Sequence, residues 1–112
     1  MDIHCWIVEN DKIIDFNFPE HQMVKRIQGL VGDKIYEPAP IVEQKMWFKK
    51  MYEKSIVFLA DGILYQFYKN PQYNCCFINA LAYKKNNKNC KIVIGKMGWR
   101  KKNSNDIFWE YG

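Results

Sequence analysis

The sequence lacks several features that would each indicate a particular class of protein, such as a membrane, secreted or repeat protein. It contains no run of about 18 apolar residues, so we expect no membrane span. Its opening, MDIHCWIVEN, does not have the basic-then-apolar order of a secretory signal. There is also no internal repeat and no low-complexity segment. These absences favour an ordinary globular domain with a cytoplasmic location.

The sequence has no Cys-x-x-Cys and no His-x-x-x-His spacing, although it contains four cysteines, Cys5, Cys75, Cys76 and Cys90. Two of the cysteines are neighbours, which makes a poor disulfide framework and indicates reduced thiols. Zinc is disfavoured too, because His4 and Cys5 would point to opposite faces of a strand. We expect no metal and no cofactor. Heavy use of Lys, Asn and Ile is typical of an AT-rich genome such as a viral one, which would place the protein in a host cytoplasm.

The composition predicts one compact domain over residues 1–112. The chain is 48% hydrophobic and 16% aromatic, which is enough apolar material for a core and too much for disorder. The net charge of +5 allows an acidic partner without requiring one. The expected fold class is α+β, a small antiparallel sheet packed against two or three helices.

Local patterns place the expected elements along the chain. Strands are predicted at 3–8, 13–17, 91–99 and 106–111. Helices are predicted at 20–31, 41–54 and 75–85. The segment 34–40 is expected to be an extended connector, because the residue before a proline avoids helix. The segment 55–69 is ambiguous: Asp61-Gly62 between apolar runs favours a hairpin, and a buried helix is the alternative.

A cysteine doublet stands at the expected start of the third helix, in NPQYNCCFINALAY. Unpaired N–H groups and the positive end of the helix dipole favour a thiolate there, and Asn74 stands where a cap belongs. A thiolate is the nucleophile in covalent catalysis by cysteine. Small Ala80 shares the face of Cys76, which mildly favours Cys76 over Cys75. The alternative is that both cysteines only fill a contact between helix and sheet.

His4 lies in the first expected hairpin, IHCWIVENDKIIDFN. With a turn of two or four residues, opposing residue numbers add up to 21, so Trp6 faces Asp15 and His4 faces Asn17. These four side chains then share one face, and Asp15 lies diagonal to His4 within reach of its ring. A carboxylate there would orient the imidazole, and Asn17 could orient it without a charge. A half-buried histidine on an edge strand is the alternative.

Two segments together resemble a known superfamily. Residues 75–80, C-C-F-I-N-A, resemble the Cys-aromatic-x-Asn-Ala signature that opens the catalytic helix of papain-like and transglutaminase-like proteins. Residues 4–15, H-C-W-I-V-E-N-D-K-I-I-D, resemble the strand pair that carries their histidine and acid. The matches cover about half of the chain. The resemblance implies a papain-like α+β domain in which Cys76 is the nucleophile, His4 the base and Asp15 the orienting acid.

The order of these segments departs from the usual one, in which the cysteine precedes the histidine strand. The sequence resembles a circular permutant cut in a hairpin between DIFWEYG and MDIHCWIV. Lecithin:retinol acyltransferase-like and desumoylating-isopeptidase-like proteins have a similar order. The Asn-Cys of YNCCF resembles the former group, which would make Cys75 the nucleophile instead.

The resemblance implies a cysteine hydrolase, peptidase or acyltransferase-like enzyme that cleaves an amide, isopeptide or thioester bond of a protein or peptide substrate. The backbone N–H of the nucleophile with Gln72 or Asn74 would form the oxyanion site. Trp6 and Asn79 would line the pocket, although Trp6 could equally pack in the core. Gln72 has the alternative role of an exposed turn amide, and Asn74 that of a plain helix cap.

A non-catalytic binding protein is the alternative to the predicted enzyme. The last third of the chain is rich in Lys and Arg, with aromatic residues between them that could stack on bases. The residues concerned are Lys84, Lys85, Lys88, Lys91, Lys96, Arg100, Lys101 and Lys102, with Trp99, Phe108 and Trp109. The chain would then be a basic binding module for nucleic acid, although no nucleic-acid motif is present. A viral or phage inhibitor that acts by occluding its target is a further alternative.

Overall fold

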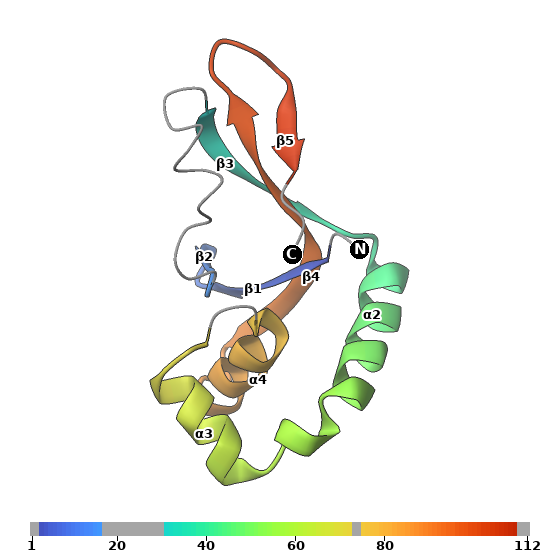
Figure 1. The fold of residues 1–112 in the computed structure, drawn as a ribbon, viewed down its shortest axis with the longest axis vertical. Coiled ribbons are helices and arrows are strands. Elements are labelled where there is room, and N and C mark those ends of the chain that lie inside the picture. The colour runs from blue at the N-terminus through green and yellow to red at the C-terminus, as the bar shows by residue number, and fades with distance from the viewer. Residues whose placement is uncertain (1–2, 17–30, 73–74, 110–112) are drawn as a thin grey trace.

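The computed structural model describes residues 3–16, 31–72 and 75–109 of the chain. Within them the fold is α+β, as predicted: a small antiparallel sheet with three α-helices (Figure 1). The strands are β1 His4–Glu9, β2 Lys12–Ile14, β3 Val31–Pro38, β4 Cys90–Lys101 and β5 Ile107–Trp109. The helices are α2 Ile41–Lys54, the short 3-10 helix η1 Ile56–Phe58, α3 Asp61–Lys69 and α4 Cys76–Asn86.

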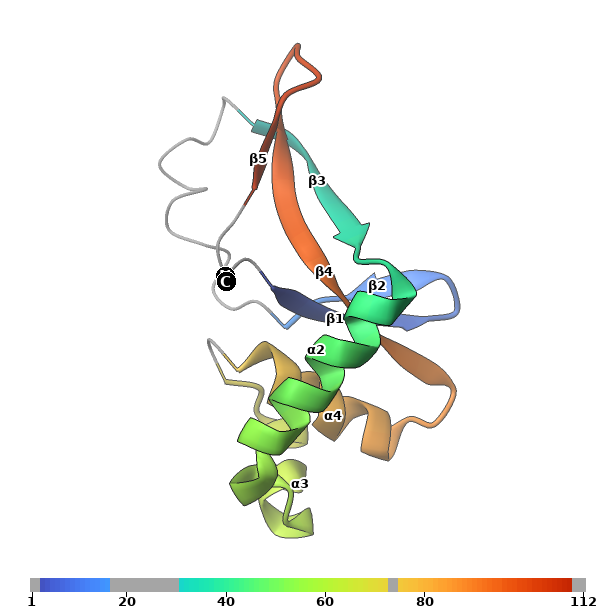
Figure 2. The same cartoon turned by 90° about the vertical axis from the view of Figure 1, so that its right-hand side faces the viewer.

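The sheet is organised around the long strand β4. The strand order is β2-β1-β4-β3, with β5 also paired to β4, and every pairing is antiparallel. The three helices gather around the end of the sheet that holds β1, while β3, β4 and β5 extend away from them as an arm (Figures 1 and 2). Since β3 pairs with Gly98 and Gly95 from one side of β4, β5 and β1 occupy its other edge, one after the other.

The β1–β2 hairpin has the register that the sequence predicted. Its pairs Val8↔Ile13 and Ile7↔Ile14 both have numbers that add up to 21. Asn10 and Asp11 form the turn with positive φ angles of 53° and 61°, as a tight two-residue hairpin turn requires. β2 ends at Ile14, earlier than the predicted strand 13–17, so Asp15 follows the strand. Asn17 lies outside the described residues.

The segment predicted as a connector at 34–40 is instead mostly a strand. Residues up to Pro38 belong to β3, which pairs with β4 through Lys34↔Trp99 and Tyr36↔Met97. The extended backbone that precedes a proline suits a strand as well as a connector, and β4 offers a free edge to pair with. The helix predicted at 20–31 falls outside the described residues, except for Val31, which begins β3.

The helical segments follow the apolar periodicity of the sequence. Helix α2 has the predicted bounds, and α4 begins one residue after the predicted start, with Cys75 as its N-cap. The hairpin at Asp61-Gly62 is wrong, because these residues open α3. Leu64 is buried and Phe67 and Tyr68 pack against the same core, which is the spacing of one helical face.

The core forms where α4 packs on β1. Cys5 and Ile7 of β1 are almost fully buried, and so are Ala80 and Ala82 of α4. The small alanine side chains let the helix approach the strand closely, which brings the start of α4 to the start of β1. No helix in the described part of the chain has the length and apolar character needed to cross a membrane.

Candidate active site

Cys76 is the first residue of α4, where the sequence predicted a reactive thiol. Cys75 precedes it as the N-cap residue, with φ −119° and ψ 41°, and accepts a hydrogen bond from the Asn79 backbone N–H at 2.8 Å. The thiol of Cys76 therefore lies near the unpaired N–H groups of the first helical turn. This position favours the thiolate over the thiol.

His4 lies at the start of β1, with 7% of its surface exposed. Its Nε2 is 2.8 Å from Oδ1 of Asp15, which is the contact that the hairpin register predicted. The His4 ring also interacts with the thiol of Cys76, which raises the pKa of the ring and lowers the pKa of the thiol. Because Nε2 is engaged with Asp15, Nδ1 is the ring nitrogen that could serve the thiol. The structure thus links the side chains of Cys76, His4 and Asp15 in a row.

Asp15 is held by two further side chains that sequence reasoning missed. The hydroxyl of Tyr36 donates to Oδ2 at 2.7 Å, and Nζ of Lys34 lies 3.2 Å from the same oxygen. Burial opposes the charge on Asp15, but the hydrogen bonds from His4 and Tyr36 and the charge of Lys34 outweigh it and lower its pKa. Reading residues 34–36 as a strand would have put Lys34 and Tyr36 on one face and revealed them as candidates.

The electrostatics favour a thiolate and an imidazolium together. A hydrogen bond from the Cys5 thiol, helped by one from His4, outweighs the effect of burial and lowers the pKa of Cys76 to about 5. Burial works against a charge on His4, but its hydrogen bonds to Asp15 and Cys76 raise its pKa to about 9. Between these values the Cys76 thiolate is paired with a charged imidazole, which is the activated state of a catalytic cysteine.

Cys5 was not predicted as part of the site, and it lies directly against it. The residue is 1% exposed and belongs to the core cluster on which Cys76 packs. Its thiol interacts with that of Cys76, and its Sγ lies 4.0 Å from Sδ of Met51. The neighbouring thiolate and burial both raise the pKa of Cys5, so this thiol stays protonated. The signal for it in the sequence was its place beside His4, although it points to the other face of β1.

The remaining predicted residues have different surroundings. Asn79 is 1% exposed and tethers the turn before α4: its Nδ2 donates to the Gln72 carbonyl at 2.8 Å, and its Oδ1 accepts from the Gln72 N–H at 3.1 Å. The Gln72 side chain is exposed and donates to the Asn70 carbonyl at 2.9 Å. Asn74 lies outside the described residues. Asn79 is therefore a positioning residue for the loop that leads into Cys76.

Trp6 supports the other side of the histidine. It is 1% exposed, and its ring centroid is 6.1 Å from that of His4 and 5.0 Å from that of Tyr36. The indole therefore packs in the core beneath these two side chains, and Trp6 takes the packing role that was the alternative to lining a pocket. Such a packed aromatic restricts the rotamers of the histidine ring.

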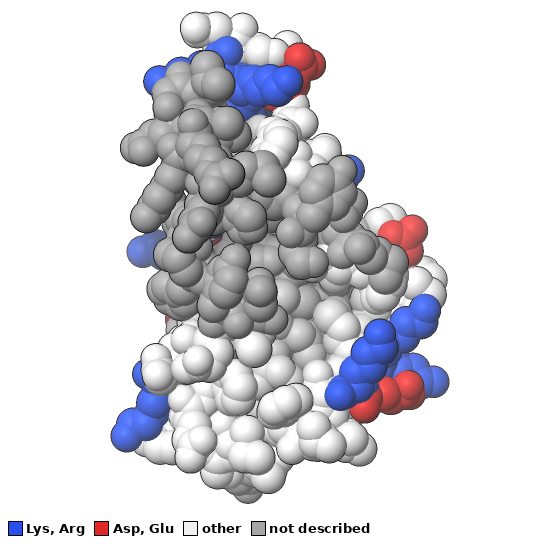
Figure 3. All heavy atoms as spheres, in the orientation of Figure 1, with Lys and Arg blue, Asp and Glu red and all other residues white. Residues whose placement is uncertain are grey.

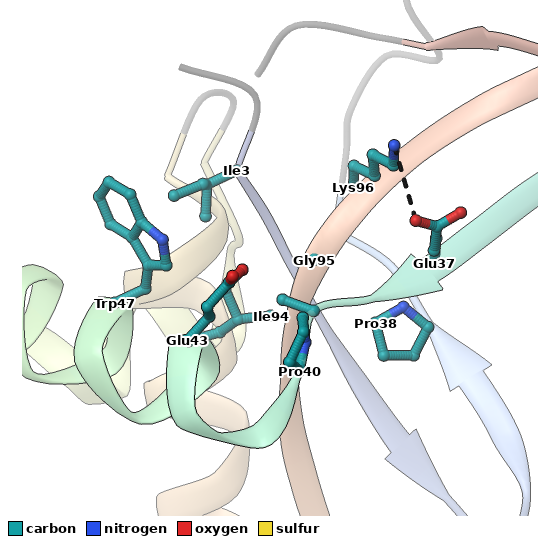
Figure 4. Close-up of a pocket in the computed structure, with 10 residues that line it drawn as sticks. Ile3, Glu37, Pro38, Pro40, Glu43, Trp47, Ile94, Gly95 and Lys96 are labelled. Atoms are coloured by element: carbon teal, nitrogen blue, oxygen red, sulfur yellow. Dashed lines mark ion pairs between the residues drawn. The ribbon is translucent and has the colours of Figure 1, made fainter.

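A pocket of about 290 Å³ lies against the same end of β1. Figure 4 shows it between the start of α2 and the crossing of β3 with β4, where the side chains of Ile3 and Trp47 face each other. Ile3 directly precedes His4, and Gly95, which also lines the pocket, is the β4 partner of His4. The pocket is therefore lined by sequence and strand neighbours of His4, but not by His4 or Cys76 themselves.

On the face that Figure 3 shows, the described Lys and Arg side chains lie in several separate groups, and those over the end of the sheet arm and over α2 have acidic residues beside them. The residues that the structure describes contain no cluster of three His, Cys, Asp or Glu side chains suited to a metal ion. Comparison of the chain with protein-family models, with curated proteins and with solved structures finds no match.

Proposed function

We propose that this chain is a cysteine hydrolase of a circularly permuted papain-like type, which cleaves an amide, isopeptide or thioester bond in a protein or peptide. The observation that carries the proposal is the hydrogen bond from the His4 ring to the Asp15 carboxylate, together with the interaction between His4 and Cys76 that raises the pKa of the ring and lowers the pKa of the thiol. The pKa of Asp15 is lowered as well, so all three shifts have the direction that this chemistry needs.

In the proposed reaction the Cys76 thiolate attacks the substrate carbonyl carbon. The carbonyl oxygen becomes an oxyanion, and the backbone N–H of Cys76 at the helix start is a suitable donor to it. The His4 imidazolium then gives its proton to the leaving amine or thiol, and a thioester on Cys76 remains. Neutral His4 next removes a proton from water, which attacks the thioester and releases the acid. An amine in place of water would give acyl transfer.

Asp15 and its partners act through His4. The carboxylate accepts the Nε2–H of His4 and stabilises the imidazolium, while Tyr36 and Lys34 hold the carboxylate in place. Its role is therefore to fix the tautomer of the ring and to direct Nδ1 toward the sulfur. This arrangement costs no reorganisation when the proton moves, since all the partners are already in place.

The sheet topology differs from the hairpin that the sequence predicted at the cut of the permuted order. β5 and β1 lie on one edge of β4 and run in the same direction, with Trp109 opposite Gly98 and His4 opposite Gly95. A chain that joined them would continue along β4, and the tight hairpin expected between them would not form. The His strand and the strand that closes the chain would thus form one nearly continuous edge in a protein with the cysteine first.

A trapping experiment tests the proposal. An activated acyl ester should acylate the full-length protein at Cys76, so that mass spectrometry finds one acyl group there that disappears with time as the thioester hydrolyses. His4→Gln should abolish the second step and slow the first, while Cys90→Ser should change neither. Acylation of Cys76 that is equally fast without His4 would contradict the proposed role of the pair.

A further inference from the structure

Cys5 and Cys76 bring two sulfurs with opposite properties into contact. Cys76 is partly exposed at the mouth of α4, whereas Cys5 is buried behind it in the core cluster that both residues share. Each thiol shifts the pKa of the other, raising that of Cys5 and lowering that of Cys76, so the two sulfurs are close neighbours within this cluster. Neither is part of a disulfide, and hydrolysis as described above needs only one of them.

We propose that Cys5 is a resolving thiol, which forms a disulfide with Cys76 when a hydroperoxide oxidises the site. In the first step the Cys76 thiolate attacks the outer oxygen of the hydroperoxide, the O–O bond breaks, and Cys76 becomes a sulfenic acid, while the His4 imidazolium gives its proton to the departing oxygen, which leaves as an alcohol or water. In the second step the Cys5 sulfur attacks the sulfenic sulfur, the S–OH bond breaks, and the proton of the Cys5 thiol leaves with the hydroxyl as water. The two sulfurs lose two electrons in total, and the hydroperoxide takes them.

The surroundings of Cys76 suit the thiolate that is oxidised, and those of Cys5 suit the thiol that forms the disulfide. The first step needs a thiolate that a small oxidant can reach, and Cys76 is the partly exposed thiol beside His4. The second step needs a thiol already in contact, because a sulfenic acid otherwise reacts with whatever it meets. Cys5 is held there by β1 and by the packing of Met51, with its sulfur 4.0 Å from Sδ of that residue. A disulfide requires the sulfurs to approach to ~2.05 Å, which a side-chain rotation at the start of a helix allows.

The disulfide would protect the site as well as stop it. While it exists, Cys76 has no free thiolate, so hydrolysis ceases. The sulfenic acid is consumed before it can be oxidised further to the irreversible sulfinic acid. A small dithiol would restore both thiols by exchange. This inference depends on the contact of the two sulfurs and not on the proposed hydrolase function.

The test is stoichiometric hydrogen peroxide on the reduced, full-length protein, followed by mass spectrometry of the whole chain and of its peptides without reduction. We expect loss of two hydrogens, one linked peptide pair that contains Cys5 and Cys76, and full recovery with dithiothreitol. In Cys5→Ala the same treatment should give a sulfenic acid that dimedone traps at Cys76, followed by sulfinic acid. Cys90→Ser should behave like the wild type.

Two results would overturn the inference. A linked pair of Cys75 with Cys76 would show that the neighbouring residue resolves the sulfenic acid. Sulfinic acid at Cys76 in the wild type, as fast as in Cys5→Ala, would show that Cys5 does not react. The first result needs only the peptide map of the wild type, so the inference can be judged even if Cys5→Ala folds poorly. Acylation of Cys76 measured separately tells whether the hydrolase proposal holds in either case.

Discussion

Helix α4 begins at one cysteine, Cys76, and is followed by another, Cys90 at the start of β4, and the pKa values of the two thiols are shifted in opposite directions. Cys76 at the N-terminal end has its pKa lowered to about 5 by the Cys5 thiol and by His4. Cys90 follows the C-terminal end, and burial raises its pKa, which nearby Glu9 raises further. The Cys90 thiol is 2.9 Å from the Asn87 carbonyl, to which it donates its proton.

This difference shows that the pKa of a cysteine thiol depends mainly on the groups around the sulfur. N–H groups and the positive end of the helix dipole surround one sulfur, while a carbonyl and the negative end surround the other. The N-terminal end also meets the start of β1 with its imidazole, whereas the C-terminal end meets Glu9 at the end of the same strand. The comparison therefore supplies a matched control: Cys90 is a thiol of the same chain whose surroundings favour the protonated form.

Removing Cys76 or Cys90 in turn should give the largest difference in reactivity between two variants. Cys76→Ala should abolish acylation by an activated ester and the rapid reaction with iodoacetamide near neutral pH, because the only activated sulfur is gone. Cys90→Ala should leave both unchanged, apart from a modest loss of stability through the small cavity. Mass spectrometry of the alkylated peptides measures both. Fast labelling of Cys90 in Cys76→Ala would contradict the comparison.

Replacing His4 should reduce the contrast between the two thiols. In the wild type, iodoacetamide labelling of Cys76 should persist as the pH falls and decline only near pH 5, because the thiolate remains the main form above its pKa. In His4→Gln the midpoint should move to higher pH, since the imidazolium no longer stabilises the thiolate. Hydrolysis should fall by ~10²–10⁴-fold, the usual worth of a general acid–base group. An unchanged midpoint would show that His4 does not act on Cys76.

Asp15→Asn tests the activation of Cys76 through Asp15, the residue that is hydrogen-bonded to His4. Without the carboxylate the pKa of His4 should fall from about 9, since the hydrogen bond to Asp15 is the main effect that raises it against burial. The imidazolium is then lost at lower pH, so the alkaline limb of the rate profile should move downward. We expect a ~10²-fold lower rate at neutral pH, in the range of lost acid–base assistance. Tyr36→Phe should move the alkaline limb of the rate profile in the same direction by a smaller amount. A shift of the pH profile distinguishes this effect from misfolding, which would lower the rate at every pH.

Gly95→Ala should disturb the site through the backbone, with an effect mainly on stability. A Cβ at Gly95 would overlap the carbonyl oxygen of Glu37 on β3, and Gly95 is also the partner of His4 on β1. The strands would have to move apart, at a cost of ~1–3 kcal/mol in the free energy of unfolding. Gly62→Ala, where the added Cβ meets nothing within 4 Å, is the control. Urea unfolding of both variants measures the difference, and equal midpoints would contradict the close approach.

Local patterns predicted most of the elements and half of the site. The apolar spacing of residues 41–54 is the spacing of α2, and the Asn10-Asp11 turn determines the hairpin register that brings Asp15 to His4. Residues 34–38 were misjudged and residues 61–69 were left open between a hairpin and a helix, because prolines and an Asp-Gly pair occur in several kinds of local structure. The sheet and the core decide between those structures by pairing β3 with β4 and by burying Leu64.

The sequence by itself determined the chemistry that each segment carries: a histidine and an acid on one face of a short hairpin, and a thiol at the start of a helix. Both follow from interactions between near neighbours, namely strand alternation and the unpaired N–H groups of a first turn. Only the tertiary structure decided that Cys76 meets His4, that Tyr36 and Lys34 hold Asp15, and that Cys5 lies beside the reactive sulfur. These contacts join segments far apart in the chain, and they exist because α4 packs on β1 and because β4 holds β1 and β3 on its two edges.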